Sequence, residues 1–223
     1  MWGAVFGDFS GSIYEYEQLK KVSSISPDDL ISKNAFFSDD TITTIAILDA
    51  ILHDVSYEKK LKEYANAFSD YHPNFEPYFS SSFSPGFMKW VKGKGEGYSI
   101  GNGALMRVSP VGYLFDSLDE VQHQAYLATV CSHNSEEAIL SSIKVASIIY
   151  LARLGFSKRE IVDTLDLNFT YMPFHKFNTT CYETLDNCLY AVFTSNSFEE
   201  SIRKVLSYGG RYRYECMYCW ISF

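Results

Sequence analysis

Apolar residues recur at intervals of three and four positions along most of the chain, the spacing that places them on one face of an α-helix. This periodicity predicts helices over residues 40–53, 57–69, 136–155 and 181–194. Capping boxes, in which a Ser and the Glu three residues later satisfy the first amide groups, predict two more. They lie over 158–165, after Ser157, and from Ser197 to about Tyr208. No segment alternates as a strand does, so the sequence predicts a compact, all-α, multi-helix domain.

The stretch between residues 70 and 100 differs in composition from the predicted helices and lacks their periodicity. It holds three Pro, four Gly and interleaved Ser and aromatic residues. Long irregular stretches inside compact domains are often functional. We therefore expect an active-site cleft formed by loops and helix starts at one end of the helical domain.

The composition and the charge of the chain exclude several classes of protein. The chain has 223 residues, of which 47% are hydrophobic and 21% charged, as is typical of a globular domain. The net charge of −8 argues against non-specific binding to a nucleic-acid backbone. No run approaches the ~18 apolar residues of a membrane helix, and the first residues lack the basic region of a signal peptide. Five Cys without framework spacing indicate reduced thiols, so a cytoplasmic protein is expected.

Near the N-terminus, residues 7–15 read Gly-Asp-Phe-Ser-Gly-Ser-Ile-Tyr-Glu. Two Gly and an Asp before a helix would let the backbone approach a ligand closely, with Asp8 and Glu15 beside it. A tight turn followed by a helix cap would account for the same residues.

A second motif, Ser38-Asp39-Asp40-Thr41, directly precedes a predicted helix. Adjacent carboxylates flanked by hydroxyls form an all-oxygen cluster, which suits a hard cation such as Mg²⁺. Ordinary helix capping also favours Ser and Asp at these positions.

The third motif is Ser99-Ile-Gly-Asn-Gly-Ala-Leu-Met-Arg107. A Gly-Asn-Gly turn that leads into an apolar run suits backbone amides facing a phosphate. A plain left-handed turn is the alternative.

In this order the motifs resemble the pattern of the ADP-ribosylglycohydrolase family: GDxxGSxxE, then [ST]DDT, then GNGxxMR, then a His after the following helix. Cys131-Ser132-His133 matches the fourth element, and the resemblance spans residues 2 to 210. It implies a family domain over residues 1–210 and an all-α fold. The implied activity is Mg²⁺-dependent hydrolysis of the glycosidic bond of an ADP-ribosylated protein or small molecule.

The same resemblance implies roles for individual residues. Two Mg²⁺ ions would lie in the site, with Ser38, Asp39 and Asp40 as ligands of the first half-site. Catalytic roles would fall to Glu15, which reaches the metal or the attacking water, and to Asp40. The positions implied to face the substrate are Asp8, Ser99, Gly101, Asn102, Gly103, Met106 and His133.

The chain departs from the family pattern after Gly209-Gly210. The family continues with Asp-Thr-Asp-Thr, the other half of the metal ligands, whereas residues 211–214 are Arg-Tyr-Arg-Tyr. If permitted codons are written for the residues from 211 onward and the reading frame is moved forward by one base, the encoded peptide becomes Asp-Thr-Asp-Thr-Asn-Ala-Cys-Ile-Val-Gly. We interpret residues 211–223 as an aberrant tail, produced by a one-base insertion or sequencing error near codon 210 or 211 that shifted the frame and truncated the chain.

This interpretation predicts that the chain binds at most one Mg²⁺ tightly and that its hydrolysis is impaired. It also predicts an uncovered C-terminal face that favours self-association. The alternative is natural divergence into a non-catalytic ADP-ribose-binding or structural, crystallin-like member, in which Arg211 and Arg213 lie beside Asp39 and Asp40.

Overall fold

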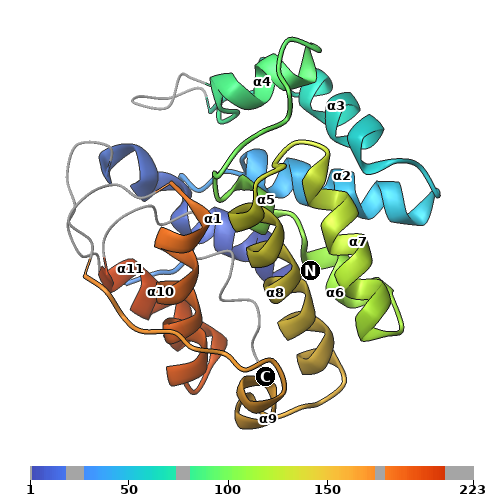
Figure 1. Cartoon of the computed structure of the whole chain (residues 1–223). Helices are drawn as coiled ribbons and strands as arrows, with labels where there is room; N and C mark the ends of the chain where they lie inside the picture. Colours follow the sequence, from blue (N-terminus) through green and yellow to red (C-terminus); the bar gives the residue numbers. More distant parts are fainter. Residues whose placement is uncertain (1, 19–27, 74–80, 174–178, 209–223) are drawn as a thin grey trace.

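The structure is a computed structural model that describes residues 2–18, 28–73, 81–173 and 179–208. Within these ranges it is built from helices and contains no strand, only one isolated β-bridge. The predicted all-α fold is therefore confirmed (Figure 1). The aberrant tail, 211–223, lies outside the described residues. The helices are α1 (Trp2–Gln18), α2 (Asp39–Leu52), α3 (Tyr57–Ala67), α4 (Pro85–Val91), α5 (Gly103–Met106), α6 (Ser109–Leu114), α7 (Leu118–Val130), α8 (Glu136–Arg153), α9 (Lys158–Thr164), α10 (Cys181–Thr194) and α11 (Phe198–Tyr208).

The six helices predicted from periodicity and capping are present, and their bounds differ from the predicted ones by no more than two residues. They are α2, α3, α8, α9, α10 and α11. The Ser157 capping box is complete, since the Ser157 side chain accepts from the Glu160 amide and Glu160 accepts from the Ser157 amide. In the second box the Glu200 carboxylate instead accepts from the amide of Asn196, one residue before the cap.

Two stretches differ from their prediction. Residues 7–15 lie inside α1, so Gly7 and Gly11 are buried helix residues and not part of a turn that approaches a ligand. Residues 85–91, expected to be irregular, form α4. The Ser84 side chain accepts from the Phe87 amide and Pro85 occupies the first turn, a local pairing that marks a helix start.

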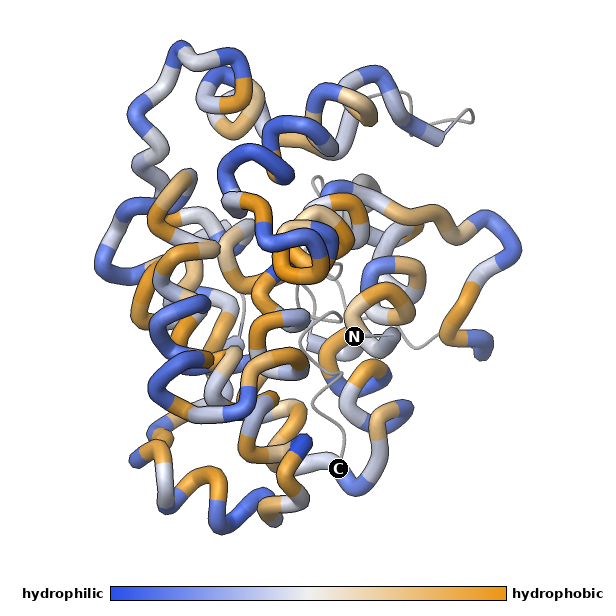
Figure 2. The backbone as a smooth tube through the Cα atoms, turned by 90° about the vertical axis from the view of Figure 1, so that its right-hand side faces the viewer, coloured by the Kyte–Doolittle hydropathy of each residue, from blue (hydrophilic) through white to orange (hydrophobic). Residues whose placement is uncertain are grey.

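The hydrophobic core surrounds α8. This helix packs against α5, α6, α7, α9 and α10, and α2 packs against α1, α3, α5 and α6. Figure 2 shows hydrophobic positions concentrated toward the middle of the molecule and hydrophilic positions on the peripheral turns. The small core residues Ala138, Val145 and Ala146 on α8 let neighbouring helices approach closely.

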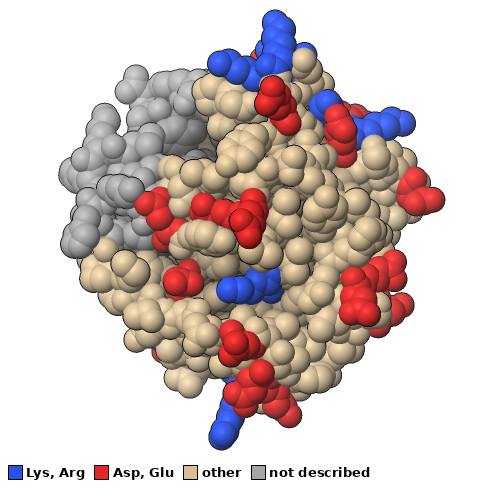
Figure 3. All heavy atoms as spheres, viewed as in Figure 1, with Lys and Arg blue, Asp and Glu red and all other residues tan. Residues whose placement is uncertain are grey.

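Charged side chains are unevenly spread over the face seen in Figure 3. Several of the Lys and Arg side chains on this face lie at the edge near α3 and α4, with some Asp and Glu among them, and further Asp and Glu are scattered over the rest. Exposed Lys89, Lys92 and Lys94 belong to α4 and the turn after it. No helix in the described ranges is long and apolar enough to cross a membrane.

A single buried carboxylate joins α1 to the start of α2. Asp8, which is 0% exposed, accepts hydrogen bonds from the amide and hydroxyl of Ser38 at 2.8 and 2.7 Å. It also accepts from the amide and hydroxyl of Thr41 at 3.3 and 2.6 Å. The carboxylate therefore satisfies amide groups that the helix itself leaves unpaired, and its charge is favourable at the positive end of α2.

We expect Asp8→Asn to destabilise the protein by about 2 kcal/mol, because an amide offers one acceptor oxygen where the carboxylate offers two. The free energy of unfolding measured by urea denaturation provides the test. The matched control is Asp70→Asn, which changes an exposed carboxylate. Equal stabilities of the two variants would show that the Asp8 contacts do not support the helix junction.

Candidate active-site pocket

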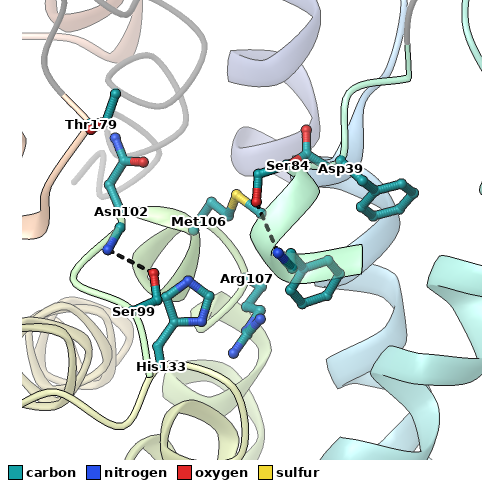
Figure 4. A pocket seen from close by; sticks show the side chains of 12 residues that line it. Asp39, Ser84, Ser99, Asn102, Met106, Arg107, His133 and Thr179 are labelled. Carbon is teal, nitrogen blue, oxygen red and sulfur yellow. Dashed lines mark hydrogen bonds between the residues drawn. The ribbon is translucent and has the colours of Figure 1, made fainter. Parts of the chain in front are cut away.

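A pocket of about 290 Å³ opens between the start of α2, α4 and the loop before α5. It is lined by Asp39, Phe83, Ser84, Phe87, Ser99, Gly101, Asn102, Gly103, Met106, Arg107, His133 and Thr179. Figure 4 shows Asp39 and Ser84 on one side and Ser99, Asn102 and His133 on the other, with Met106 and Arg107 between them. The two walls therefore differ in chemistry, with an acidic group facing hydrogen-bonding and cationic groups.

The loop before α5 is held by the start of α10. An isolated antiparallel bridge joins Gly101 to Thr180. The Asn102 amide donates to the Thr179 carbonyl at 2.9 Å, and the Cys181 amide donates to the Ile100 carbonyl at 3.0 Å. These contacts fix the Gly-Asn-Gly segment and bring Thr179 into the pocket wall.

The start of α8 supports the same loop from another side. The Ser135 hydroxyl donates to the Ser99 carbonyl at 2.7 Å, while the same side chain accepts from the amide of Ala138. The Asn134 amide donates to the carbonyl of Gly97. Residues that are distant in sequence thus hold one pocket wall in place.

The Gly-Asn-Gly segment is not a left-handed turn. Asn102 has φ −66°, and the glycines with positive φ in the described residues are Gly93, Gly97 and Gly155. The amides of Gly101 and Asn102 bond to Ser99 Oγ and to the Thr179 carbonyl. These two amides are therefore engaged within the protein, contrary to the expectation that they face a phosphate.

The glycines have a steric role instead. An ideal Cβ added to Gly103 would lie 3.3 Å from His133 Nε2 and 3.6 Å from Met106 Cε, and one added to Gly101 would lie 3.9 Å from the same nitrogen. The absence of side chains at these positions leaves the edge of the imidazole open to the pocket.

His133 and Arg107 are both buried in the same pocket wall, and Arg107 is the charged member of the pair. Burial lowers the pKa of the His133 imidazole well below its usual range, and the nearby charge of Arg107 lowers it further. The Arg107 guanidinium is 1% exposed and donates through Nη2 to the Ala128 carbonyl in the last turn of α7, the negative end of that helix. Burial lowers its pKa too, but an arginine remains charged at neutral pH.

The start of α2 brings oxygen atoms into close contact beside the pocket. Ser38 Oγ lies 2.7 Å from Asp8 Oδ1 and 2.8 Å from Asp40 Oδ2. A hydroxyl carries one hydrogen and cannot donate to both carboxylates. The second contact requires a proton on a carboxyl group or a cation nearby. Carboxylate and hydroxyl oxygens are also the kind of ligand that Mg²⁺ prefers. In the described residues, however, no group of three or more His, Cys, Asp or Glu is arranged to hold a metal.

The structure brings most of the predicted site residues together. The residues that line the pocket are Asp39, Ser99, Gly101, Asn102, Gly103, Met106 and His133. Asp8, Ser38 and Asp40 are fully buried and do not line it. Glu15 lies in α1, and its side chain is outside the described part of the chain.

Sequence reasoning named Arg107 only as the last residue of the third motif, and it missed four lining residues: Phe83, Ser84, Phe87 and Thr179. The Ser84-Pro85 pair is a helix-start signal that could have placed Phe87 on an ordered element. No local signal identifies Thr179, because its place depends on pairing with the distant loop before α5.

The sequence profile of the ADP-ribosylglycohydrolase family matches residues 1–213. This chain belongs to that family. ADP-ribosylhydrolase ARH3 of Mus musculus is 26% identical over 184 residues, which cover 71% of this chain and 49% of the relative. Human ARH3 is 26% identical over 185 residues, covering 71% and 50%. The chain spans about half the length of these curated relatives.

A solved structure described as an ADP-ribosylglycohydrolase-related protein complex has the same fold. It superposes with a TM-score of 0.75 at 16% identity and covers 99% of this chain and 83% of that chain. At this level of identity the likeness concerns the fold alone.

The low pKa of His133 has a consequence for stability. The folded protein keeps this side chain neutral, whereas the unfolded chain protonates it below its ordinary pKa of about 6.5. Acid therefore favours the unfolded state. The free energy of unfolding should therefore fall between about pH 7 and about pH 5, and it should fall more steeply for the wild type than for His133→Gln. The difference between the two slopes should reach up to ~1.4 kcal/mol per pH unit.

Urea denaturation over this pH range checks the expectation. His123→Gln, which changes an exposed histidine of α7, is the control. Parallel pH dependences of the wild type and His133→Gln would contradict a neutral His133.

Proposed function

We propose that this pocket binds the ADP-ribose part of an ADP-ribosylated protein or small molecule, and that the chain's activity is hydrolysis of its glycosidic bond. The observation that carries the proposal is the convergence of the family's motif residues on one pocket, from Asp39 on one wall to Asn102 and His133 on the other. Membership of the family supplies the reaction class.

The distribution of charge in the pocket suits such a ligand. The positive charge of Arg107 favours the negative diphosphate, because a buried cation is poorly screened by water. Phe83 and Phe87, whose ring centroids lie 5.8 Å apart, offer an apolar surface for a ring of the ligand. The acidic wall at Asp39 would then lie near the reacting end.

Ser38, Asp39 and Asp40 are the residues that would hold Mg²⁺. Mg²⁺ held there would lower the pKa of a water and offset negative charge at the reacting oxygens. Asp8 keeps these residues in place by holding the Ser38 and Thr41 amides. Glu15 is the proposed group that orients the attacking water and moves its proton.

Binding can be tested separately from turnover. Gly103→Ala puts a methyl group beside His133 Nε2 and should weaken ADP-ribose binding roughly tenfold or more, measured by calorimetry. The matched control is Gly86→Ala, where an added Cβ meets nothing within 4 Å. Binding that is equal in the two variants would show that the ligand does not enter this pocket. Release of ADP-ribose from modified peptides, with Mg²⁺ and with a chelator, then tests the reaction itself.

Residues 211–214 bear on how active the chain is. The proposed shift of reading frame puts Arg211 and Arg213 where the family pattern has two Asp ligands. We expect the quadruple variant Arg211→Asp, Tyr212→Thr, Arg213→Asp, Tyr214→Thr to gain stabilisation by Mg²⁺, seen as a rise in Tm. Its rate of hydrolysis should also rise on the order of 10²-fold, because the second half of the metal ligands is restored.

A variant with Asn at 211 and 213 and Thr at 212 and 214 is the control, since it changes the same positions without adding negative charge. Equal Mg²⁺-dependent activity in the original chain and the repaired variant would show that these ligands are dispensable. Binding of ADP-ribose without turnover in both proteins would favour the second candidate function, a non-catalytic ADP-ribose-binding member. The DNA sequence across codons 208–215 decides whether the frame is shifted.

A further inference from the structure

Three buried side chains form a chain of contacts that ends at the pocket. Arg107 Nη2 lies 2.6 Å from Ser132 Oγ, and Ser132 Oγ lies 2.9 Å from His133 Nδ1. Their residues are 1%, 4% and 7% exposed, so water does not replace these contacts. The three residues come from the end of α5 and the turn between α7 and α8.

The number of hydrogens sets the direction of these bonds. An arginine only donates, so Ser132 Oγ accepts from Arg107. Within the described residues, the nitrogen or oxygen atom that can accept the single hydroxyl hydrogen of Ser132 is then His133 Nδ1. The adjacent Cys131 thiol is the competing group, and sulfur is a weak acceptor. If Nδ1 carried the hydrogen and donated to Ser132, the buried hydroxyl would lose its acceptor, which is costly.

The other ring nitrogen faces the pocket. His133 Nε2 lies next to the backbone of Gly101 and Gly103, and it has no hydrogen-bond partner among the described residues. A neutral imidazole carries one hydrogen, so an unprotonated Nδ1 leaves Nε2 as a donor. Burial favours this neutral form over the imidazolium, and the positive charge of Arg107 favours it further.

We infer that Ser132 is a positioning residue. Because its hydroxyl accepts from Arg107, its own hydrogen is donated to His133 Nδ1, and this bond holds the imidazole as the Nε2–H tautomer. The pocket wall thereby presents a fixed hydrogen-bond donor to an acceptor oxygen of the ligand, a phosphate or ribose oxygen. The identity of that ligand rests on the proposed function, whereas the tautomer is a property of the protein alone.

Nitrogen NMR of the full chain labelled with ¹⁵N-histidine tests the tautomer directly, because protonated and unprotonated ring nitrogens resonate far apart. The His133 signals are assigned by their loss in His133→Gln. We expect Nδ1 to be unprotonated and Nε2 protonated in the wild type. Ser132→Ala should replace this state by exchange between the two tautomers, and Ser132→Thr, which keeps a hydroxyl, should restore it.

The matched control is Ser147→Ala, which removes a buried hydroxyl of α8 that has no hydrogen-bond partner in the described part of the chain. It should change neither the tautomer nor ligand binding. Thermal unfolding of each variant verifies that it folds. A wild type with protonated Nδ1, or a tautomer that Ser132→Ala leaves unchanged, would overturn the inference.

Calorimetry with ADP-ribose adds a second readout. Ser132→Ala should bind about tenfold more weakly than the wild type and Ser132→Thr should recover affinity. If the wild type does not bind ADP-ribose, the proposed function fails, while the NMR result still decides the role of Ser132. If ADP-ribose binds the wild type and Ser132→Ala equally, the positioning role is wrong even though the function stands.

Discussion

The site depends first on the burial of the Asp8 carboxylate against the start of α2. Its two oxygens accept from both the backbone and the hydroxyls of Ser38 and Thr41, so they set the position of α1 relative to α2. Asp39 lies between these two residues and faces the pocket. A carboxylate with no exposed surface is tolerable only because its hydrogen bonds replace those of water, and this requirement makes the junction specific.

The opposite wall depends on contacts between loops and not on helix packing. The loop before α5 is bridged to the start of α10 and bonded to the cap of α8. Its glycines leave the His133 ring edge uncovered, since a side chain at Gly103 would contact Nε2. Because this loop is supported on both sides, its residues keep defined places beside the His133 ring, which a mobile loop could not ensure.

Electrostatics divide the pocket into two parts. The buried guanidinium of Arg107 is stabilised by the carbonyl end of α7, and among the described residues it forms no ion pair with a carboxylate. Burial, and to a smaller extent this charge, lowers the pKa of His133 and keeps the imidazole neutral, while the charge gives one wall a positive potential. Across the pocket, Asp39 adjoins the crowded oxygens of Asp8, Ser38 and Asp40. An anion and a cation are therefore favoured at opposite walls of the same cavity.

The sequence by itself determined the helices whose signals are local. The spacing of apolar residues in α8 and the Ser157–Glu160 capping box act within a few residues, so they could be read without knowing the neighbours. The order of the motifs also identified the family, because side chains needed by one chemistry recur in one order. Only the tertiary structure placed residues 7–15 inside α1, made Asp8 a buried acceptor and linked Arg107 to His133 through Ser132. Those outcomes depend on burial and on hydrogen bonds between residues far apart in the chain, such as Asp8 and Ser38, which lie 30 positions apart, and no local propensity encodes them.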